Sequence, residues 1–304
     1  MKTKKTLLVA GLLIPTCLFI VSCSQSHTEQ AANELHFDLR EISELTISYD
    51  EEPLTFFRSD TGELIIKEYM TESKERYYAD VKQGNGSIQI SEGGKPFFRG
   101  GFSRYVEVYM PEEYHGSLSV TSTDGKIDLS GVDLALASLR IDSTAGTVLL
   151  DSADAADIHL STTSGTLDLG SITGKQIRLE TTSGLIACTK LNGAVTYTST
   201  SGDIDVKSAV GSGTYRANNS GKLKVAYSKV TGDLSFFNKN DSIDLTLPPD
   251  LAFEFEATTK NGTVTTSFQE CTSIEGQTAR GTVGDAPAVT VKTETKNGNI
   301  QVTQ

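Results

Sequence analysis

The feature that most constrains the fold is a repeat with a period of about twenty residues. In residues 161–188, STTSGTLDLGSITGKQIRLETTSGLIAC, the tetrapeptide TTSG occurs twice, 19 residues apart, and an alternating apolar run follows each copy. Glycines recur at this phase, and from Gly125 to Gly262 the steps are 18 to 21 residues, with Asp241 in place of one glycine. A unit of this size cannot bury its own apolar face, so successive units must stack and share one core. The aligned turn glycines are Gly62, Gly86, Gly125, Gly146, Gly165, Gly184, Gly202, Gly221, Gly262 and Gly298.

The residues around each turn alternate between apolar and polar types. The second residue after each turn is Leu, Ile or Val, and the fourth is apolar except at Thr266. A second alternating pair precedes the turns, as at Ile158 and Leu160. Period-two alternation is typical of strands with one buried face. We therefore predict an all-β fold, a single-stranded β-solenoid (right-handed β-helix) of about ten coils of about 19 residues. Each coil is expected to consist of a strand, a turn, a second strand and a second turn.

Stacking also predicts columns of equivalent turn residues. The position three before the glycine is expected to point inward, where hydroxyl and amide groups can satisfy buried backbone groups. Its members are Ser122, Ser143, Thr162, Thr181, Ser199, Asn218 and Asn238. The position two before the glycine is expected to face solvent. Its members are Thr123, Thr144, Thr163, Thr182 and Thr200.

A β-propeller is the alternative fold, because two units sum to about the length of one blade. Aspartates recur at every second unit, which would fit such a pairing of units. They are Asp128, Asp168, Asp205 and Asp244. The apolar and hydroxyl columns repeat at every unit instead, and no Gly-His or Trp-Asp blade signature is present. These observations favour the solenoid.

Two segments carry a resemblance to a known family. They are YVEVYMPEEYHGSLSVTSTDGKIDL (residues 105–129) and the closing TETKNGNIQVTQ (residues 293–304). Over about residues 35–304 the chain resembles the bacterial "putative adhesin" family with β-strand repeats, a domain of unassigned biochemical function. The resemblance implies a β-strand repeat domain on an envelope protein and supplies no catalytic or binding residues. Residues 267–287 lack the column pattern and are expected to form a loop or an irregular penultimate coil.

The N-terminus has the pattern of a secretory signal. Lys2, Lys4 and Lys5 precede an apolar stretch that is too short for a spanning helix, and Ile-Val-Ser-Cys closes it like a bacterial lipobox. We predict a lipoprotein signal peptide over 1–22, lipidation (palmitate among the acyl chains) at Cys23, a polar tether over 23–34 and the solenoid over 35–304. An ordinary signal peptide with a chance cysteine is the alternative. A doubly or triply acylated Cys23 would anchor the protein to the membrane without spanning it.

Charge excludes one class of partner. The formal net charge is −12, and removal of three lysines with residues 1–22 changes it to −15. Nucleic acid is therefore not expected as a partner. The location is expected to be extracytoplasmic, on the cell membrane, or on the outer membrane if the source is Gram-negative.

No catalytic or metal motif stands out. The four histidines show neither metal-ligand spacing nor a triad, so we expect no metal and no cofactor. They are His27, His36, His115 and His159. The recurrent aspartates with Lys224 are the only candidates for a polysaccharide lyase or hydrolase. Aspartates two coils apart would lie about 10 Å from one another, at or beyond the range of paired carboxylates in glycoside hydrolysis.

We therefore expect a non-enzymatic binding or adhesion module of the cell envelope. A structural or signalling component of an envelope-stress response is the first alternative, and a polysaccharide-active enzyme is the second. The candidate ligand face is the outward threonine column, because side chains repeating about every 4.8 Å can meet a periodic envelope glycan at several points. Another envelope protein is an alternative partner, and threonine is also a common exposed strand residue.

Overall fold

The structure is a computed structural model that describes residues 30–97, 100–269, 271–274 and 277–304. Residues 31–304 form one compact unit, separate from residues 1–30. The predicted signal peptide, Cys23 and most of the tether lie outside the described residues. The first strand, β1 (Asn33–Phe37), pairs antiparallel with β4 (Leu64–Met70).

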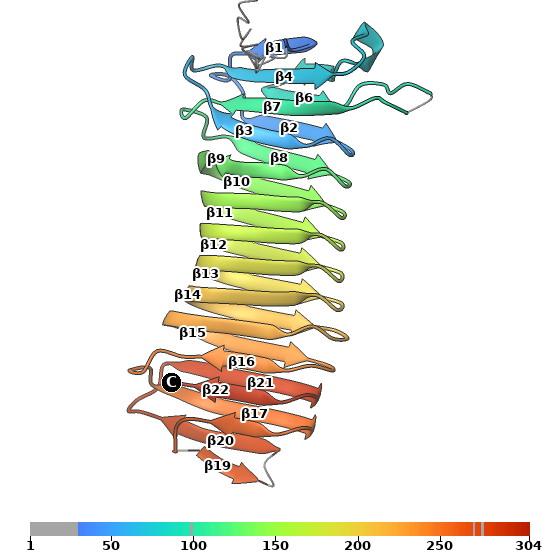
Figure 1. Cartoon of the computed structure of the whole chain (residues 1–304). Helices are drawn as coiled ribbons and strands as arrows, with labels where there is room; N and C mark the ends of the chain where they lie inside the picture. Colours follow the sequence, from blue (N-terminus) through green and yellow to red (C-terminus); the bar gives the residue numbers. More distant parts are fainter. Residues whose placement is uncertain (1–29, 98–99, 270, 275–276) are drawn as a thin grey trace, which may run out of the picture. The chain divides into compact units, whose positions relative to one another are not determined.

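Six long strands build the middle of the unit (Figure 1). They are β10 (Asp133–Ser143), β11 (Thr147–Thr162), β12 (Thr166–Thr181), β13 (Leu185–Ser199), β14 (Asp203–Ala217) and β15 (Leu223–Asn238). Each pairs in parallel with the next, so the ladder is that of stacked coils and the β-propeller alternative is wrong. Each coil is one strand that runs from tight turn to tight turn through a bend. A corner within the continuous strand replaces the predicted second turn. In β11 the buried positions shift by one residue on either side of Ala153 and Ala155, where the pairs 151–152 and 156–157 both lie outside the core.

The glycine column follows from close approach of successive turns. A Cβ atom on Gly146 would lie 2.1 Å from the carbonyl oxygen of Gly125, and one on Gly165 would lie 2.1 Å from that of Gly146. The same contact recurs to the C-terminal end, where Gly298 lies against the backbone of Asp241 and Gly262 against that of Gly298. Glycine recurs because a Cβ atom at these positions would press on the backbone of the neighbouring turn, and Asp241 is an exception to this column.

The predicted inward columns form the core. Ile204, for example, is 1% exposed, and its equivalents in neighbouring coils are buried with it. The hydroxyl column satisfies turn amides as expected: the Gly165 N–H donates to Thr162 Oγ1 over 2.9 Å, and the Gly184 N–H to Thr181 Oγ1 over 2.7 Å.

Asn218 is a correction to this column. It is exposed, and buried Ala217 pairs with Ser199 and with Asn238 in its place. Four positions separate buried Ala217 from Gly221, against three between Ser199 and Gly202, so counting back three from Gly221 reaches the wrong residue.

The N-terminal end departs from sequential stacking. Its remaining elements are β2 (Glu44–Tyr49), β3 (Leu54–Arg58), the 3-10 helix η1 (Glu75–Tyr77), β5 (Asp80–Gly84), β6 (Ser87–Ser91), β7 (Arg104–Met110), β8 (Ser117–Ser122) and β9 (Ile127–Gly131). Strand β2 pairs in parallel with β6 and β8, and β3 with β7 and β9, so the first coil lies between later ones. Asn85 and Gly86, with φ of 53° and 73°, close an antiparallel β5–β6 hairpin. The assignment of Gly86 to the solenoid turn column is therefore wrong.

A buried ion network lies at this end. The Arg104 side chain is 0% exposed, and its Nη2 lies 3.1 Å from Glu52 Oε1 and 2.5 Å from Glu92 Oε1. Its Nη1 donates to the Tyr77 carbonyl oxygen over 2.6 Å, which ties η1 to the core. Lys95 Nζ lies 2.7 Å from the same Glu92 oxygen. The network joins the segment from η1 to β7 to the first coil, which contains β2 and β3.

The C-terminal end is also out of order. Its elements are β16 (Ile243–Thr246), β17 (Phe253–Asn261), β18 (Val264–Thr266), β19 (Cys271–Ile274), β20 (Thr278–Val283), β21 (Val289–Asn297) and β22 (Ile300–Thr303). The last coil, β21 and β22, is inserted between β15/β16 and β17/β18. Strand β20 pairs antiparallel with β17, and β19 with β20. Residues 267–287 thus hold an antiparallel pair of strands, not the expected loop or irregular coil.

Candidate binding surfaces

The first candidate surface is the turn edge, which we define as the tight turns from β8–β9 to β21–β22, on the right in Figure 1. Thr123, Thr144, Thr163, Thr182 and Thr200 are all exposed on it. Backbone hydrogen bonds hold successive turns together, as from the Thr163 N–H to the Thr144 carbonyl oxygen over 3.1 Å. Of these five threonines, only Thr123 has a side-chain hydroxyl that is hydrogen-bonded to another described residue. It donates to Asp50 Oδ1 over 2.7 Å. The role of this column as a ligand face stays a prediction.

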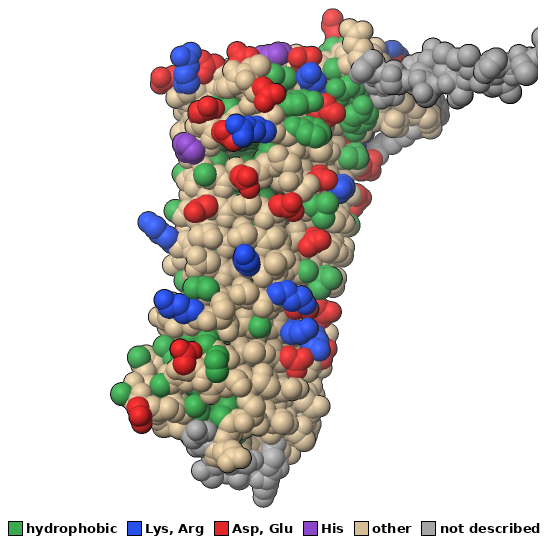
Figure 2. Space-filling model, turned by 60° about the vertical axis from the view of Figure 1, so that its left-hand side comes forward, with side chains coloured by type: hydrophobic (Ala, Val, Ile, Leu, Met, Phe, Trp, Pro, Cys, Tyr) green, Lys and Arg blue, Asp and Glu red, His purple; other side chains and the backbone are tan. Residues whose placement is uncertain are grey.

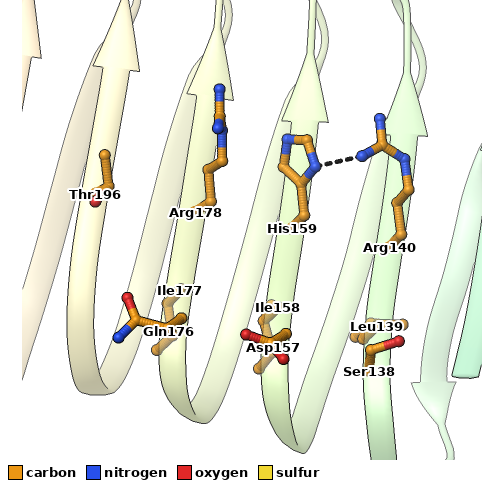
Figure 3. Close-up of a pocket in the computed structure, with 10 residues that line it drawn as sticks. All are labelled: Ser138, Leu139, Arg140, Asp157, Ile158, His159, Gln176, Ile177, Arg178 and Thr196. Carbon is orange, nitrogen blue, oxygen red and sulfur yellow. Dashed lines mark hydrogen bonds between the residues drawn. The ribbon is translucent and has the colours of Figure 1, made fainter.

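The second surface is a groove of about 460 Å³ across β10–β13, shown in Figure 3. One row of outward side chains comes from four successive coils: Arg140, His159, Arg178 and Thr196. A second row, two residues earlier on its strands, is Ser138, Asp157 and Gln176. Figure 3 shows the two rows standing apart across the strands, so the groove follows the direction of stacking.

His159 is held at the centre of the first row by two neighbours. Its Nδ1 lies 2.5 Å from Arg140 Nη1, and its Nε2 lies 2.6 Å from Glu180 Oε2. A guanidinium can only donate, so Arg140 is the donor in its contact with Nδ1, and a carboxylate can only accept, so Nε2–H is the donor in the contact with Glu180.

The arginines of the groove are paired in place, whereas the Asp157 carboxylate makes no ion pair in the described structure. Arg178 Nη2 donates to Glu180 Oε1 over 2.6 Å, and this hydrogen bond is the main cause of the lowered pKa of that carboxyl. Arg140 Nε lies 2.6 Å from Asp142 Oδ2. A set of paired charges with neutral hydroxyl and amide groups suits a hydroxylated ligand better than a highly charged one.

The aspartates proposed for catalysis lie on another outward face. Register places them on alternate strands in one row, with Leu149, Ala187 and Lys224 between them, as predicted. Asp205 lies 2.6 Å from Lys207 Nζ and 3.5 Å from Lys224 Nζ. Burial would raise the pKa of Asp205, but the hydrogen bond from Lys207 and the charge of Lys224 outweigh it, and the net pKa is lowered.

The pKa of Asp128 is lowered in the same way, because hydrogen bonds from Lys126 and Ser130 outweigh the effect of burial. A general acid in glycoside hydrolysis needs a raised pKa. These two carboxyls therefore do not have the raised pKa that a general acid requires. Figure 2 shows acidic and basic side chains interspersed over one face of the molecule, in keeping with such local pairing.

The third surface is an aromatic cluster on the outward face of β3, β4 and β7. Tyr69 and Tyr105 are stacked with centroids 4.5 Å apart, and Phe57 and Tyr109 with centroids 5.3 Å apart. The hydroxyls of Tyr69 and Tyr109 both donate to Glu107 Oε2 over 2.9 Å. Figure 2 shows hydrophobic side chains, in green, gathered in the N-terminal part of the molecule. Such cross-strand aromatic pairs stabilise a sheet, and these lie where the N-terminal coils are irregular.

The chain is similar to known proteins in sequence and in fold. The model of the family described as Toastrack DUF4097 matches residues 42–303. The chain belongs to the Toastrack family. This confirms the resemblance carried by residues 105–129 and 293–304, and Toastrack is a solenoid-like all-β fold.

Solved structures also resemble this Toastrack chain. A "putative cell adhesion protein" from Clostridium sporogenes is 14% identical, with 90% of this chain and 99% of that chain covered and a TM-score of 0.33. A "putative adhesin" from Parabacteroides distasonis is 11% identical, with coverage of 88% and 96% and a TM-score of 0.44. No curated protein matches the chain.

Sequence reasoning missed two features of this Toastrack domain. His159 shows no metal-ligand spacing or triad in the sequence, and register places it between Arg140 and Arg178 in the groove. The signal was present in the sequence, since all three stand at the same phase of successive units. The outward tyrosines of YVEVYM were likewise readable from alternation. No helix among the described residues is long and apolar enough to cross a membrane.

Proposed function

We propose that this Toastrack protein is a lipid-anchored, extracytoplasmic binding module of the cell envelope, without enzymatic activity. We further propose that it binds a neutral glycan strand in the groove across β10–β13. The groove is the observation that carries this proposal, because it presents a row of polar side chains from four successive coils.

The chemistry of the groove supports a glycan. Guanidinium, imidazole, carboxamide, carboxylate and hydroxyl groups face one channel, and together they can donate to and accept from sugar hydroxyls. Successive members of a row are separated by about 4.8 Å, so one strand can contact several of them at once. The parallel ladder fixes that spacing, so little ordering is needed when the ligand binds.

The test of binding uses the full-length chain, purified in detergent, on glycan arrays and purified cell-wall fragments. Asp157→Ala with Gln176→Ala removes two groove side chains that make no hydrogen bond or ion pair in the described structure. The matched variant on the turn edge is Thr163→Lys with Thr182→Lys, both at exposed positions. Loss of glycan binding in the first variant alone supports the groove.

Loss of glycan binding in the turn-edge variant alone would place the binding site at the threonine column instead. Failure of the unmodified chain to retain any glycan would overturn the proposal, and turnover of a fragment would revive the enzyme alternative. Circular dichroism of both variants checks that the fold is retained.

The lipid anchor is tested separately with Cys23→Ser. The unmodified chain is expected in the membrane fraction of cells and the variant in the soluble extracytoplasmic fraction, because the thiol that receives the lipid is gone. Equal membrane retention of both would contradict the anchoring proposal while leaving the groove proposal standing.

A further inference from the structure

The C-terminal end of the turn edge carries a column of lysines. Lys239, Lys260 and Lys296 are exposed and occupy the turn position that threonine holds in the earlier coils. Their order in space differs from their order in the chain, because the last coil is inserted. The Asn297 N–H donates to the Lys239 carbonyl oxygen over 3.0 Å, and Asn297 is paired with Asn261. Lys296 therefore lies between Lys239 and Lys260, with one strand spacing on each side.

These three lysines lie at one register position on directly adjacent strands. Several cations on the strand faces have a carboxylate two residues away along the strand, as in Lys126–Asp128, Arg178–Glu180 and Lys207–Asp205, and the unpaired lysines there do not form such a column. Within the described residues, none of the three turn-edge lysines has a carboxylate within ion-pair distance. Like charges on directly adjacent strands repel one another, so this arrangement works against the stability of the fold.

Hydrogen-bond donors accompany the lysines. The side chains of the neighbouring asparagines form a ladder, from Asn261 to Asn297 over 2.7 Å and from Asn297 to Asn240 over 2.7 Å. Each of these amides uses one N–H in the ladder and keeps a second N–H for another acceptor. Arg216 adds a further cation beside the edge, where its guanidinium lies 4.3 Å from the Phe237 ring centroid and bonds Asn218.

Nearby acids do not neutralise the column. Asp241 accepts the backbone N–H of Ser242 through Oδ1 over 2.7 Å. Glu294 lies two residues before Lys296, half-buried on β21, and makes no ion pair in the described structure. The rest of the chain is acidic, but at physiological salt its field is screened beyond about 8 Å. A local anion can therefore meet unpaired ammonium and amide donors.

We infer that Lys239, Lys296 and Lys260, with the asparagine ladder beside them, form a binding site for a phosphate-bearing polyanion. A polymer with closely spaced phosphates can contact all three ammonium groups at once, which a single small anion cannot. The same chemistry is offered by a soluble or wall-attached polyphosphate chain and by a surface of anionic lipid headgroups. This inference concerns a surface other than the groove and does not depend on glycan binding there.

The test measures binding of the full-length chain, purified in detergent, to immobilised inorganic polyphosphate. The variant is Lys239→Gln with Lys260→Gln and Lys296→Gln. The matched control is Lys82→Gln with Lys175→Gln and Lys229→Gln, three exposed lysines without an ion pair in the described residues. Both variants lose the same charge. We expect the turn-edge variant to bind at least about tenfold more weakly and the control to stay within about twofold, since close multivalent contacts carry the affinity.

A second arm separates the two sources of phosphate. Mixed micelles containing phosphatidylglycerol, with phosphatidylcholine micelles as reference, are used to compete with polyphosphate. If phosphatidylglycerol micelles compete with polyphosphate and phosphatidylcholine micelles do not, the site is assigned to lipid headgroups. If neither kind of micelle competes, the site is assigned to a polymer. Equal polyphosphate binding by the turn-edge variant and the unmodified chain would overturn the inference, and so would an equal loss in the control.

Discussion

Substitution of one column glycine tests the account of the repeat most directly. In Gly165→Ala, the added Cβ atom would lie 2.1 Å from the Gly146 carbonyl oxygen and 2.8 Å from Thr162 Oγ1. Real Cβ atoms essentially never approach another atom closer than 3.0 Å, so the two turns must separate by about 1 Å. Backbone hydrogen bonds between these turns span 3.1 Å (Thr163 to Thr144), 2.8 Å (Ser164 to Thr144) and 3.3 Å (Thr166 to Gly146).

A separation of about 1 Å takes all three beyond hydrogen-bonding distance. At about 0.5–1.5 kcal/mol for each bond, loss of the three should lower the free energy of unfolding by about 1.5–4.5 kcal/mol. The control is Gly84→Ala, where nothing lies within 4 Å of the added atom and the change should stay within about 0.5 kcal/mol. Urea unfolding followed by circular dichroism measures both. A Gly165→Ala protein as stable as the control would refute the close-approach explanation of the glycine column.

Three further predictions concern the core, a thiol and the ion network. Ile204→Ala should lower the free energy of unfolding by about 2–5 kcal/mol, because Ile204 is 1% exposed, whereas outward Asp205→Ala should cost less than about 1 kcal/mol; equal effects in urea unfolding would mean that the faces are misassigned. Burial raises the pKa of the Cys188 thiol to about 12, so alkylation at pH 8 followed by peptide mass spectrometry should modify Cys188 only after unfolding; fast modification of the native protein would contradict its burial. Arg104→Met should cost about 3–5 kcal/mol at pH 7, because Glu52 and Glu92 would be left with Lys95 as the one cation that both contact; the loss should shrink as pH falls and these carboxyls are protonated, and a pH-independent loss would argue against the network.

The middle of the fold could be predicted from the sequence because its determinants are local and repeated. Each long strand places its second and fourth residues after the turn inward, as at Ile186 and Cys188, and each turn carries a glycine where two backbones meet. Neighbours in sequence are neighbours in space there, so one alignment on the glycines yields the register. Where a turn gains a residue, as before Gly221, the same alignment misplaces Asn218.

The ends could not be predicted because their order depends on contacts between distant segments. The coil of Lys296 lies between those of Lys239 and Lys260, and the similar turn sequences TETKNG and TTKNG do not predict this order. The Asn-Gly turn at Asn85 reads like the other turns, yet its positive φ values make a hairpin. The row of Arg140, His159 and Arg178 could have been predicted, because the three residues occupy equivalent positions in successive repeats. Their hydrogen bonds depend on side-chain conformations, which periodicity does not determine.

The inserted last coil constrains how the chain can fold as it emerges. From β8 to β16 each coil can add to the one before it as the chain is made from its N-terminus. Strands β17 and β18 have no such place, because the surface of β15 and β16 on which the stack continues belongs to β21 and β22. The edge at β15 and β16 therefore stays open until residues 289–303 arrive, and pairing at this end has to bridge more than fifty residues at once. This end of the stack is therefore complete only when residues 289–303 are present, and a chain that stops before residue 289 would leave the edge of β15 and β16 without its native partner strands.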